Sequence, residues 1–227
     1  MPSLGSVTVN QSPSAGPVRD PQRAARLLRA ERDALLPVLR ETPVAAFDRP
    51  TMCPGWSVRD VLAHCTAALT RVIEDQLHAF TPELNEADVA DRRGWPLSRL
   101  LDELDGSYAG AAAVITEAGG RLDGIALGEW VHGGDVREAL GLPLAFAGEG
   151  FHDACVLLAE RTRRRAAPLV LATLPDVCLS LGVPGPGRPP AELRADRGSL
   201  VRLYAGRPAD PAAYQLSGAR PAELVVF

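Results

Sequence analysis

The chain has 227 residues, of which 46% are apolar and 23% charged, and its formal net charge is −4. This length and composition are typical of a globular protein with one large domain or two small ones. The acidic balance argues against a nucleic-acid partner, and no apolar run is long enough to predict a membrane span.

Residues 1–20 are rich in Ser, Pro and Gly. They contain neither the basic region nor the apolar region of a secretory signal. We therefore expect a disordered tail over residues 1–20 and a cytoplasmic protein.

Two amphipathic helices follow the tail. Residues 21–42 place Leu and Ala at helical intervals, which predicts the first helix. The second helix starts at Ser57, an N-cap residue with Asp60 three positions later, which is a carboxylate variant of the capping box. Its apolar stripe continues to about residue 80, and His64 falls at the edge of that stripe. We therefore expect His64 where a buried face meets a cavity or solvent.

Three more helices are predicted after a polar interval at residues 81–95. They span residues 96–120, 123–141 and 149–165. The second of the three is rich in glycine, and each glycine costs about 1 kcal/mol of helix stability against Ala. This cost suggests close approach to a neighbouring element or to a ligand. The third ends in the basic run from Arg161 to Arg165, which either complements the helix dipole or binds an anion.

The pattern changes after Pro168. Short apolar runs predict strands, and one amphipathic run predicts a helix at residues 198–207. The expected strands are residues 169–174, 176–183, 192–198, 214–218 and 224–227. We therefore predict an α+β fold in which a helical bundle (residues 21–166) precedes a small α+β domain (residues 167–227).

His64, Glu129 and His132 are the candidate metal ligands. Catalytic zinc sites use three N or O ligands and keep a fourth position open. Glu129 and His132 lie one helical turn apart, so both can reach one ion, and His64 would approach it from a facing helix. Asp135, one turn beyond His132, can accept a hydrogen bond from the other ring nitrogen of His132. Spacing alone leaves open a second reading, in which all of these are ordinary polar residues of amphipathic helices.

The four cysteines form no regular pattern. In a cytosolic chain we expect them to be small buried residues and neither disulfide partners nor zinc ligands.

Two segments resemble the signatures of a known family. CPGWSVRDVLAH (residues 53–64) looks like the N-terminal signature of the mycothiol-dependent maleylpyruvate isomerase family, and GEWVHGGDVREALG (residues 128–141) resembles its second signature. The residues from LVRLYAGRPAD onward are similar to the small, sterol-carrier-like C-terminal domain of that family. The resemblance implies a DinB-like four-helix bundle that holds a divalent metal, followed by a small α/β domain.

The resemblance assigns the metal, zinc or another divalent ion, to His64, Glu129 and His132. The chain departs from the family in one respect. The family commonly spaces its last two ligands four residues apart, whereas Glu129 and His132 are three apart and position 128 is Gly. Either Glu129 reaches the metal from a different angle or Asp135 takes its place.

The implied activity is metal-dependent use of a low-molecular-weight thiol, mycothiol, for isomerisation or S-transfer on a small electrophilic, maleylpyruvate-like substrate. Arg207, or Arg202 near it, would close over the cleft, and the alternative for both is an ordinary surface position. All basic residues are Arg, a bias typical of GC-rich genomes such as those of actinomycetes. Two alternatives stay open for the whole chain: thiol exchange on a natural-product intermediate in secondary metabolism, and a non-enzymatic bundle that binds a metal or another ligand.

Overall fold

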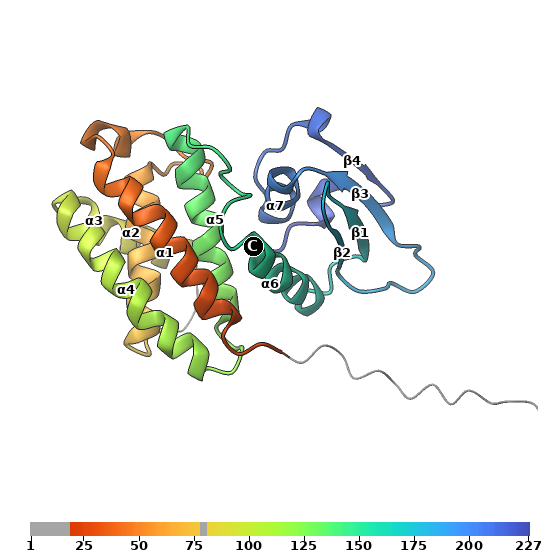
Figure 1. Cartoon of the computed structure of the whole chain (residues 1–227), viewed down its shortest axis with the longest axis horizontal. Coiled ribbons are helices and arrows are strands. Elements are labelled where there is room, and N and C mark those ends of the chain that lie inside the picture. Colours follow the sequence, from red (N-terminus) through yellow and green to blue (C-terminus); the bar gives the residue numbers. More distant parts are fainter. Residues whose placement is uncertain (1–18, 78–80) are drawn as a thin grey trace, which may run out of the picture.

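A bundle of long helices and a small sheet lie side by side in the structure (Figure 1). The computed structural model describes residues 19–77 and 81–227, so the tail expected over residues 1–20 lies outside the described residues except for its last two. The helices are α1 (Arg23–Glu41), α2 (Val58–Ile73), α3 (Pro82–Arg93), α4 (Leu97–Glu117), α5 (Asp123–Leu140), α6 (Phe151–Arg164) and α7 (Arg197–Ala205). The strands are β1 (Val170–Thr173), β2 (Cys178–Leu181), β3 (Ala191–Ala195) and β4 (Tyr214–Ser217). This architecture confirms the predicted α+β fold class.

Helices α1, α2, α4 and α5 form the expected four-helix bundle. α1 and α2 each pack against both α4 and α5, and α3 packs against α2. The apolar stripes point into a shared core, in which Leu27, Leu62 and Leu104 are almost fully buried. No helix among the described residues has both the length and the apolarity that crossing a bilayer requires.

The start of α2 is fixed by the predicted capping box. The Ser57 side chain accepts a hydrogen bond from the backbone N–H of Asp60, and the Asp60 carboxylate accepts one from the backbone N–H of Ser57 at 3.0 Å. Both bonds satisfy amide groups at the N-terminal end of the helix, so the chain enters α2 at a defined residue. This entry places His64 in the second turn of α2, where it is only 6% exposed.

The polar interval at residues 81–95, for which no helix is predicted, mostly forms α3. Thr81 caps this helix by accepting a hydrogen bond from the Leu84 N–H, and Pro82 occupies the first turn, where its missing N–H is not needed. Only Asp88 and Val89 of α3 are buried, so the helix lacks an apolar stripe. α2 also ends earlier than predicted, at Ile73.

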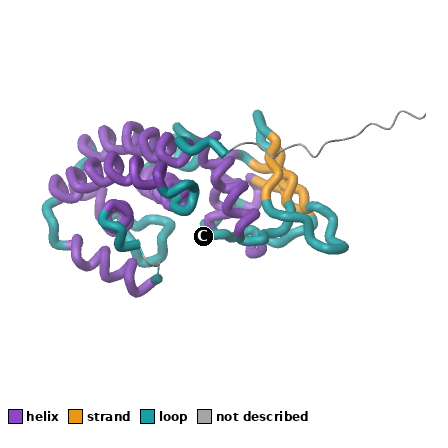
Figure 2. The backbone as a smooth tube through the Cα atoms, turned by 90° about the horizontal axis from the view of Figure 1, so that it is seen from below, coloured by secondary structure: helices purple, strands orange, loops and turns teal. Residues whose placement is uncertain are grey.

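The strands form one mixed sheet in the order β2-β1-β3-β4. β1 pairs antiparallel with β2 and parallel with β3, and β3 pairs antiparallel with β4. α6 contacts both α5 and β2, and α6 and α7 lie between the bundle and the sheet (Figures 1 and 2). The sheet therefore reaches the bundle through these two helices.

The strand predicted at residues 224–227 is wrong. Leu224 and Val226 are buried, but the Val226 N–H donates to the carbonyl of Tyr204, at the end of α7, at 3.0 Å. The alternating apolar residues therefore reflect packing against α7 and not pairing in the sheet. This segment brings the end of the chain back between the C-terminal domain and the bundle (Figure 1).

Candidate metal centre

His64, Glu129 and His132 line one cavity of about 400 Å³ between α2, α5 and α6. Four chain segments outside these helices also contribute to it. The remaining lining residues are Ala68, Leu77, Asn85, Arg121, Leu122, Gly124, Ile125, Gly128, Arg161 and Phe227. The structure therefore brings the three predicted ligands to the same cavity.

The two histidines face each other across this cavity. Their ring centroids lie 5.2 Å apart in an edge-to-face arrangement, and the Trp56 ring lies 5.0 Å from that of His64. Zinc binds imidazole nitrogen at about 2.0–2.1 Å, so a single ion fits between two rings at this separation. Burial, together with the nearby His132, lowers the pKa of His64 to about 3. His64 is therefore neutral at pH 7, which is the form that binds a metal.

The orientation of His132 is set by Asp135. His132 Nδ1 lies 3.2 Å from Asp135 Oδ2, and Asp135 in turn accepts hydrogen bonds from Arg207 Nε and Nη2 at 2.9 and 2.8 Å. Because an ionised carboxylate only accepts hydrogen bonds, this contact places the hydrogen of neutral His132 on Nδ1. His132 Nε2 then keeps its lone pair for a metal.

Asp135 is held ionised by the same contacts. Burial acts to raise its pKa, but the hydrogen bonds from His132 and Arg207, together with the charge of Arg207, lower it below the ordinary value. Arg207 follows α7 in the C-terminal domain, so this ion pair connects the two domains directly beside the histidines.

Glu129 is the third predicted ligand, and it is only 3% exposed. Burial raises its pKa to about 8, partly opposed by a hydrogen bond with Cys65. Its Oε2 atom is buried and has no hydrogen-bond partner among the described residues. An unpartnered buried carboxylate oxygen on the cavity wall is a suitable donor for a cation. The donor set of two imidazoles and this carboxylate therefore suits a divalent metal.

A second group of donor atoms lies behind His132. Cys53 Sγ, a nitrogen of His132 and a carboxylate oxygen of Asp135 lie within 4.8 Å of one another, and within the described ranges no other three such residues, including the predicted set, come this close. Arg207 Nη2 occupies this group, at 3.3 Å from Cys53 Sγ and 2.8 Å from Asp135 Oδ2. A guanidinium cation at these distances already neutralises Asp135 and would repel a metal ion there.

The two arginines predicted to act on the substrate lie in different surroundings. Arg207 contacts Asp135 and Cys53, as described above, and its side chain is 16% exposed. Arg202 forms an ion pair with Glu138 and lies 5.1 Å from the centroid of the Phe146 ring. Neither is among the described residues that line the cavity. Arg207 therefore acts on the site through Asp135 in this conformation.

The contacts of Cys53 and Trp56 beside the two histidines were not predicted from the sequence. Both residues belong to the CPGW turn before α2, whose neighbour His64 was the available signal. The expectation that all four cysteines are buried is wrong for Cys178, which is exposed on β2, although all four are free thiols.

Comparison with known proteins identifies the helical domain. Residues 28–135 match the family described as "Mycothiol maleylpyruvate isomerase N-terminal domain". The helical domain belongs to this family. No curated protein matches the sequence.

Two solved structures resemble the chain as a whole. One is "Crystal structure of the mycothiol-dependent maleylpyruvate isomerase", with 16% identity and a TM-score of 0.57, covering 89% of this chain and 95% of that chain. The other is a histidine-to-alanine mutant of that enzyme, with 15% identity, a TM-score of 0.55 and the same coverage. At these identities the likeness shows that the two-domain fold is shared. The match of residues 28–135 to the family model, together with this shared fold, confirms the resemblance to the mycothiol-dependent maleylpyruvate isomerase family.

The family match and the shared fold cover different parts of the site. The matched residues include both histidines, Glu129 and Asp135, whereas Arg207 lies in the part covered only by the fold comparison. The family match and the shared fold together support an enzyme of the mycothiol-dependent maleylpyruvate isomerase class.

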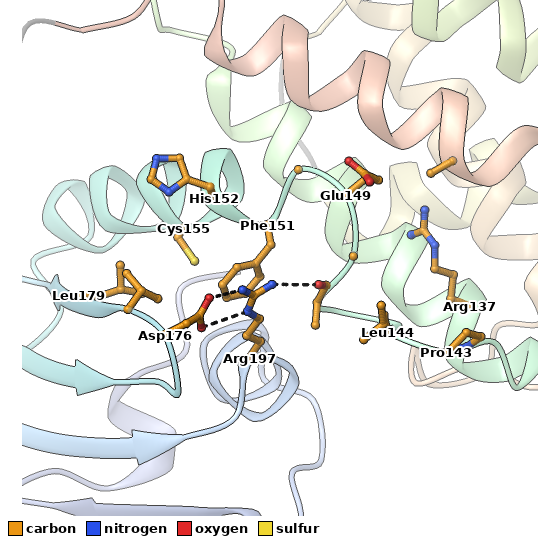
Figure 3. Close-up of a pocket in the computed structure, with 15 residues that line it drawn as sticks. Arg137, Pro143, Leu144, Glu149, Phe151, His152, Cys155, Asp176, Leu179 and Arg197 are labelled. Atoms are coloured by element: carbon orange, nitrogen blue, oxygen red, sulfur yellow. Dashed lines mark hydrogen bonds and ion pairs between the residues drawn. The ribbon is translucent and has the colours of Figure 1, made fainter.

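A larger cavity, of about 740 Å³, lies at the junction of the two domains (Figure 3). Its two cations are already paired: Arg197 with Asp176, and Arg137 with Glu31 at 2.7 Å. Its thiol, Cys155, is buried, and burial raises the pKa of that thiol to about 12. Because these groups are satisfied or inert, this cavity carries no evident chemistry.

Proposed function

We propose that this chain is a metal-dependent enzyme that uses a low-molecular-weight thiol, mycothiol, for isomerisation or S-transfer on a small electrophilic, maleylpyruvate-like substrate. The observation that carries the proposal is the cavity on which His64, Glu129 and His132 converge, inside a domain of the mycothiol maleylpyruvate isomerase family.

We assign the metal to His64, His132 and Glu129, with zinc as the expected ion. When bound, a divalent cation lowers the pKa of a coordinated thiol, so that the thiolate is available at neutral pH. His64 presents a neutral imidazole, because its pKa is about 3. Asp135 fixes the orientation of His132, and Arg207 keeps Asp135 in place. Glu129 supplies the carboxylate once it is deprotonated.

The isomerisation needs no oxidant and no net proton transfer. The thiolate sulfur adds to one carbon of the cis double bond, a C–S bond forms, and the π electrons move toward the conjugated carbonyl. Rotation about the resulting single bond follows. The same electrons then return, the double bond reforms in the trans geometry, and the thiolate leaves. In S-transfer the C–S bond is retained, and the carbon bound to sulfur either loses a leaving group or its neighbour takes a proton.

Metal binding tests the assignment first. Wild-type protein should bind one equivalent of Zn²⁺, and the double variant His64→Ala, His132→Ala should bind none while its helical circular dichroism is retained. His152→Ala removes an exposed histidine of α6 that does not line this cavity, and it should bind zinc like the wild type. Absence of zinc binding by the wild type, or equal binding by the double variant, overturns the assignment.

Turnover tests the reaction. The zinc-loaded chain, mixed with mycothiol and maleylpyruvate, should form the trans isomer or accumulate a thioether, and these products distinguish isomerase from S-transferase. Activity should fall to background in the double variant. A zinc-loaded wild type without either product would instead favour thiol exchange on another substrate or a binding role.

A further inference from the structure

The wall of the metal cavity carries two cations. Arg161 of α6 and Arg121, in the turn before α5, line the same cavity as the two histidines. The only side-chain carboxylate among the described lining residues is Glu129. The side chains of the lining therefore carry a positive net charge whether or not Glu129 is ionised, which favours an anionic ligand.

The guanidinium of Arg161 is held in a defined place. Its Nε donates to the carbonyl of Val226 at 2.7 Å, and its Cζ lies 4.4 Å from the centroid of the Phe227 ring. A Cβ at position 124 of α5 would lie 3.1 Å from Arg161 Nη1, so the glycine at that position makes room for the guanidinium. A cation fixed in this way loses little entropy when a ligand binds.

Arg161 differs from three other partly buried arginines of the chain. Arg137, Arg202 and Arg207 each form an ion pair with a carboxylate, whereas Arg161 forms none among the described residues. Burial and the charges of Arg165 and Arg164 lower the pKa of Arg161, which means that its surroundings oppose the charge. An anion placed beside Arg161 would compensate this unfavourable environment.

We propose that Arg161 anchors a carboxylate group of the substrate in the metal cavity. The inference rests on the proposed function, because it treats this cavity as the reaction site. The new element is the role of Arg161, which orients the carboxylate of the substrate within the cavity. A guanidinium binds a carboxylate through two parallel hydrogen bonds, so it fixes direction as well as position. The arginines of the basic run at the end of α6 thus have different roles. Arg164 forms an ion pair with Glu160, whereas Arg161 lines the cavity and binds the carboxylate there.

Calorimetric titration with maleate, a simple dicarboxylate, tests the proposal on zinc-loaded protein and on metal-free protein. Arg161→Gln should weaken maleate binding by about tenfold or more, because a charge-assisted hydrogen bond is lost. Arg161→Lys should recover part of the affinity, since it restores the charge but not the planar fork. Arg164→Gln removes a neighbouring but half-exposed cation of the same helix and should bind maleate like the wild type.

Phe227→Ala provides a second variant that keeps the charge of Arg161 while removing the ring beneath it. It should weaken maleate binding less than Arg161→Gln does. Equal maleate affinity for Arg161→Gln and the wild type, or no binding by the wild type, overturns the proposal. Zinc content tests the metal assignment separately. If the wild-type protein binds no zinc but Arg161→Gln still lowers maleate affinity, the proposed function is contradicted. The role of Arg161 as a carboxylate anchor is supported in that case.

Discussion

Among single residues, His132 has the most informative surroundings, because its ring links a buried ion pair to a cavity. Asp135 holds one ring nitrogen at 3.2 Å, and the ring centroid lies 5.2 Å from that of His64. Asp135 accepts on both carboxylate oxygens, from Arg207 Nε on Oδ1 and from Arg207 Nη2 and His132 on Oδ2, whereas a neutral amide would turn an NH2 donor toward one of these groups. The affinity of His132 for a metal therefore depends on the charge of Asp135.

We predict that Asp135→Asn lowers zinc affinity by about 10- to 100-fold, the usual effect of losing a carboxylate behind a histidine ligand. Competition with a chromophoric chelator measures this change. Glu138→Gln is the matched control, because Glu138 pairs with Arg202 away from the cavity. Asp135→Asn protein with unchanged zinc affinity would show that His132 is not a ligand.

Position 128 offers a test of the third ligand. It lies one full turn before His132 on the cavity wall, and a Cβ there meets nothing within 4 Å. We predict that Gly128→Glu raises zinc affinity by about tenfold or more, because it adds a carboxylate on the face of α5 that carries His132. Gly128→Gln has the same shape without the charge. Equal zinc affinity for these two variants would contradict the prediction.

The candidate ligands were predicted from the resemblance to the two family signatures, because spacing alone also allowed ordinary polar residues of amphipathic helices. The residues around them could not be predicted. Cys53 bonds to Asp135 across 82 positions of the sequence, and Arg207 reaches Cys53 across 154. Such contacts depend on how the two domains pack, which no local pattern records.

At the scale of elements, the capping box of α2 sets where His64 lies. Ser57→Ala removes one of its two bonds and should lower the free energy of unfolding by about 1 kcal/mol. Urea unfolding measures this change, and the zinc affinity of the refolded variant should stay close to that of the wild type, because packing of α2 in the bundle holds the helix in place. A loss of stability well below this value would show that packing alone fixes the start of α2.

The Asp60 carboxylate of the capping box makes the free energy of unfolding depend on pH. Burial acts to raise the pKa of Asp60, but hydrogen bonds from Ser57 and the charge of Arg93 lower it below the ordinary value. Stability from a carboxylate with a lowered pKa is fully present above the pKa in the unfolded chain, near 4, and is lost as the pH falls through the folded pKa. The difference in unfolding free energy between wild type and Asp60→Asn should therefore shrink as the pH drops below about 4. A difference that stays constant from pH 7 to pH 3 would contradict this account.

Elements were predictable where they carry a local signal. α1, α2, α4, α5 and α6 have apolar stripes or clear caps, whereas α3 buries only Asp88 and Val89 and lies as a polar helix on α2. Its Thr81-Pro82-Glu83 start was the signal that could have revealed it. In the C-terminal segment a local signal was present but misleading. Its alternating apolar residues predicted a strand, whereas Val226 packs against α7.

Two of the glycines in α5 are explained by close contacts that leave no room for a Cβ. A Cβ at position 133 would lie 1.7 Å from Glu31 Oε1, and one at position 134 would lie 2.2 Å from the Phe146 ring. The close approach that the sequence suggested thus occurs at these two positions, next to the buried pair of Glu31 and Arg137.

At the scale of the whole molecule, the site is shared between domains. Arg207 of the C-terminal domain pairs with Asp135 of α5, and the Val226–Phe227 segment supports Arg161 on the cavity wall. A metal that binds only the folded chain should stabilise it as a unit. At a free zinc concentration of 100 times Kd, the gain is about 2.7 kcal/mol, or about 5–10 °C in Tm for a chain of this size.

Differential scanning calorimetry with and without zinc measures this shift. A chelator should reverse it, and the double variant His64→Ala, His132→Ala should show none. An equal shift in the double variant would place the stabilising metal elsewhere in the molecule.

X-ray absorption at the zinc edge of the zinc-loaded protein, recorded without thiol, tests the central assignment most directly. Ligation by His64, His132 and Glu129 predicts only nitrogen and oxygen neighbours at about 2.0–2.1 Å, with the outer-shell scattering of two imidazoles. A sulfur neighbour at about 2.3 Å would place the metal on Cys53, in its group with His132 and Asp135, or on Cys65 beside Glu129. That result would contradict the proposed site.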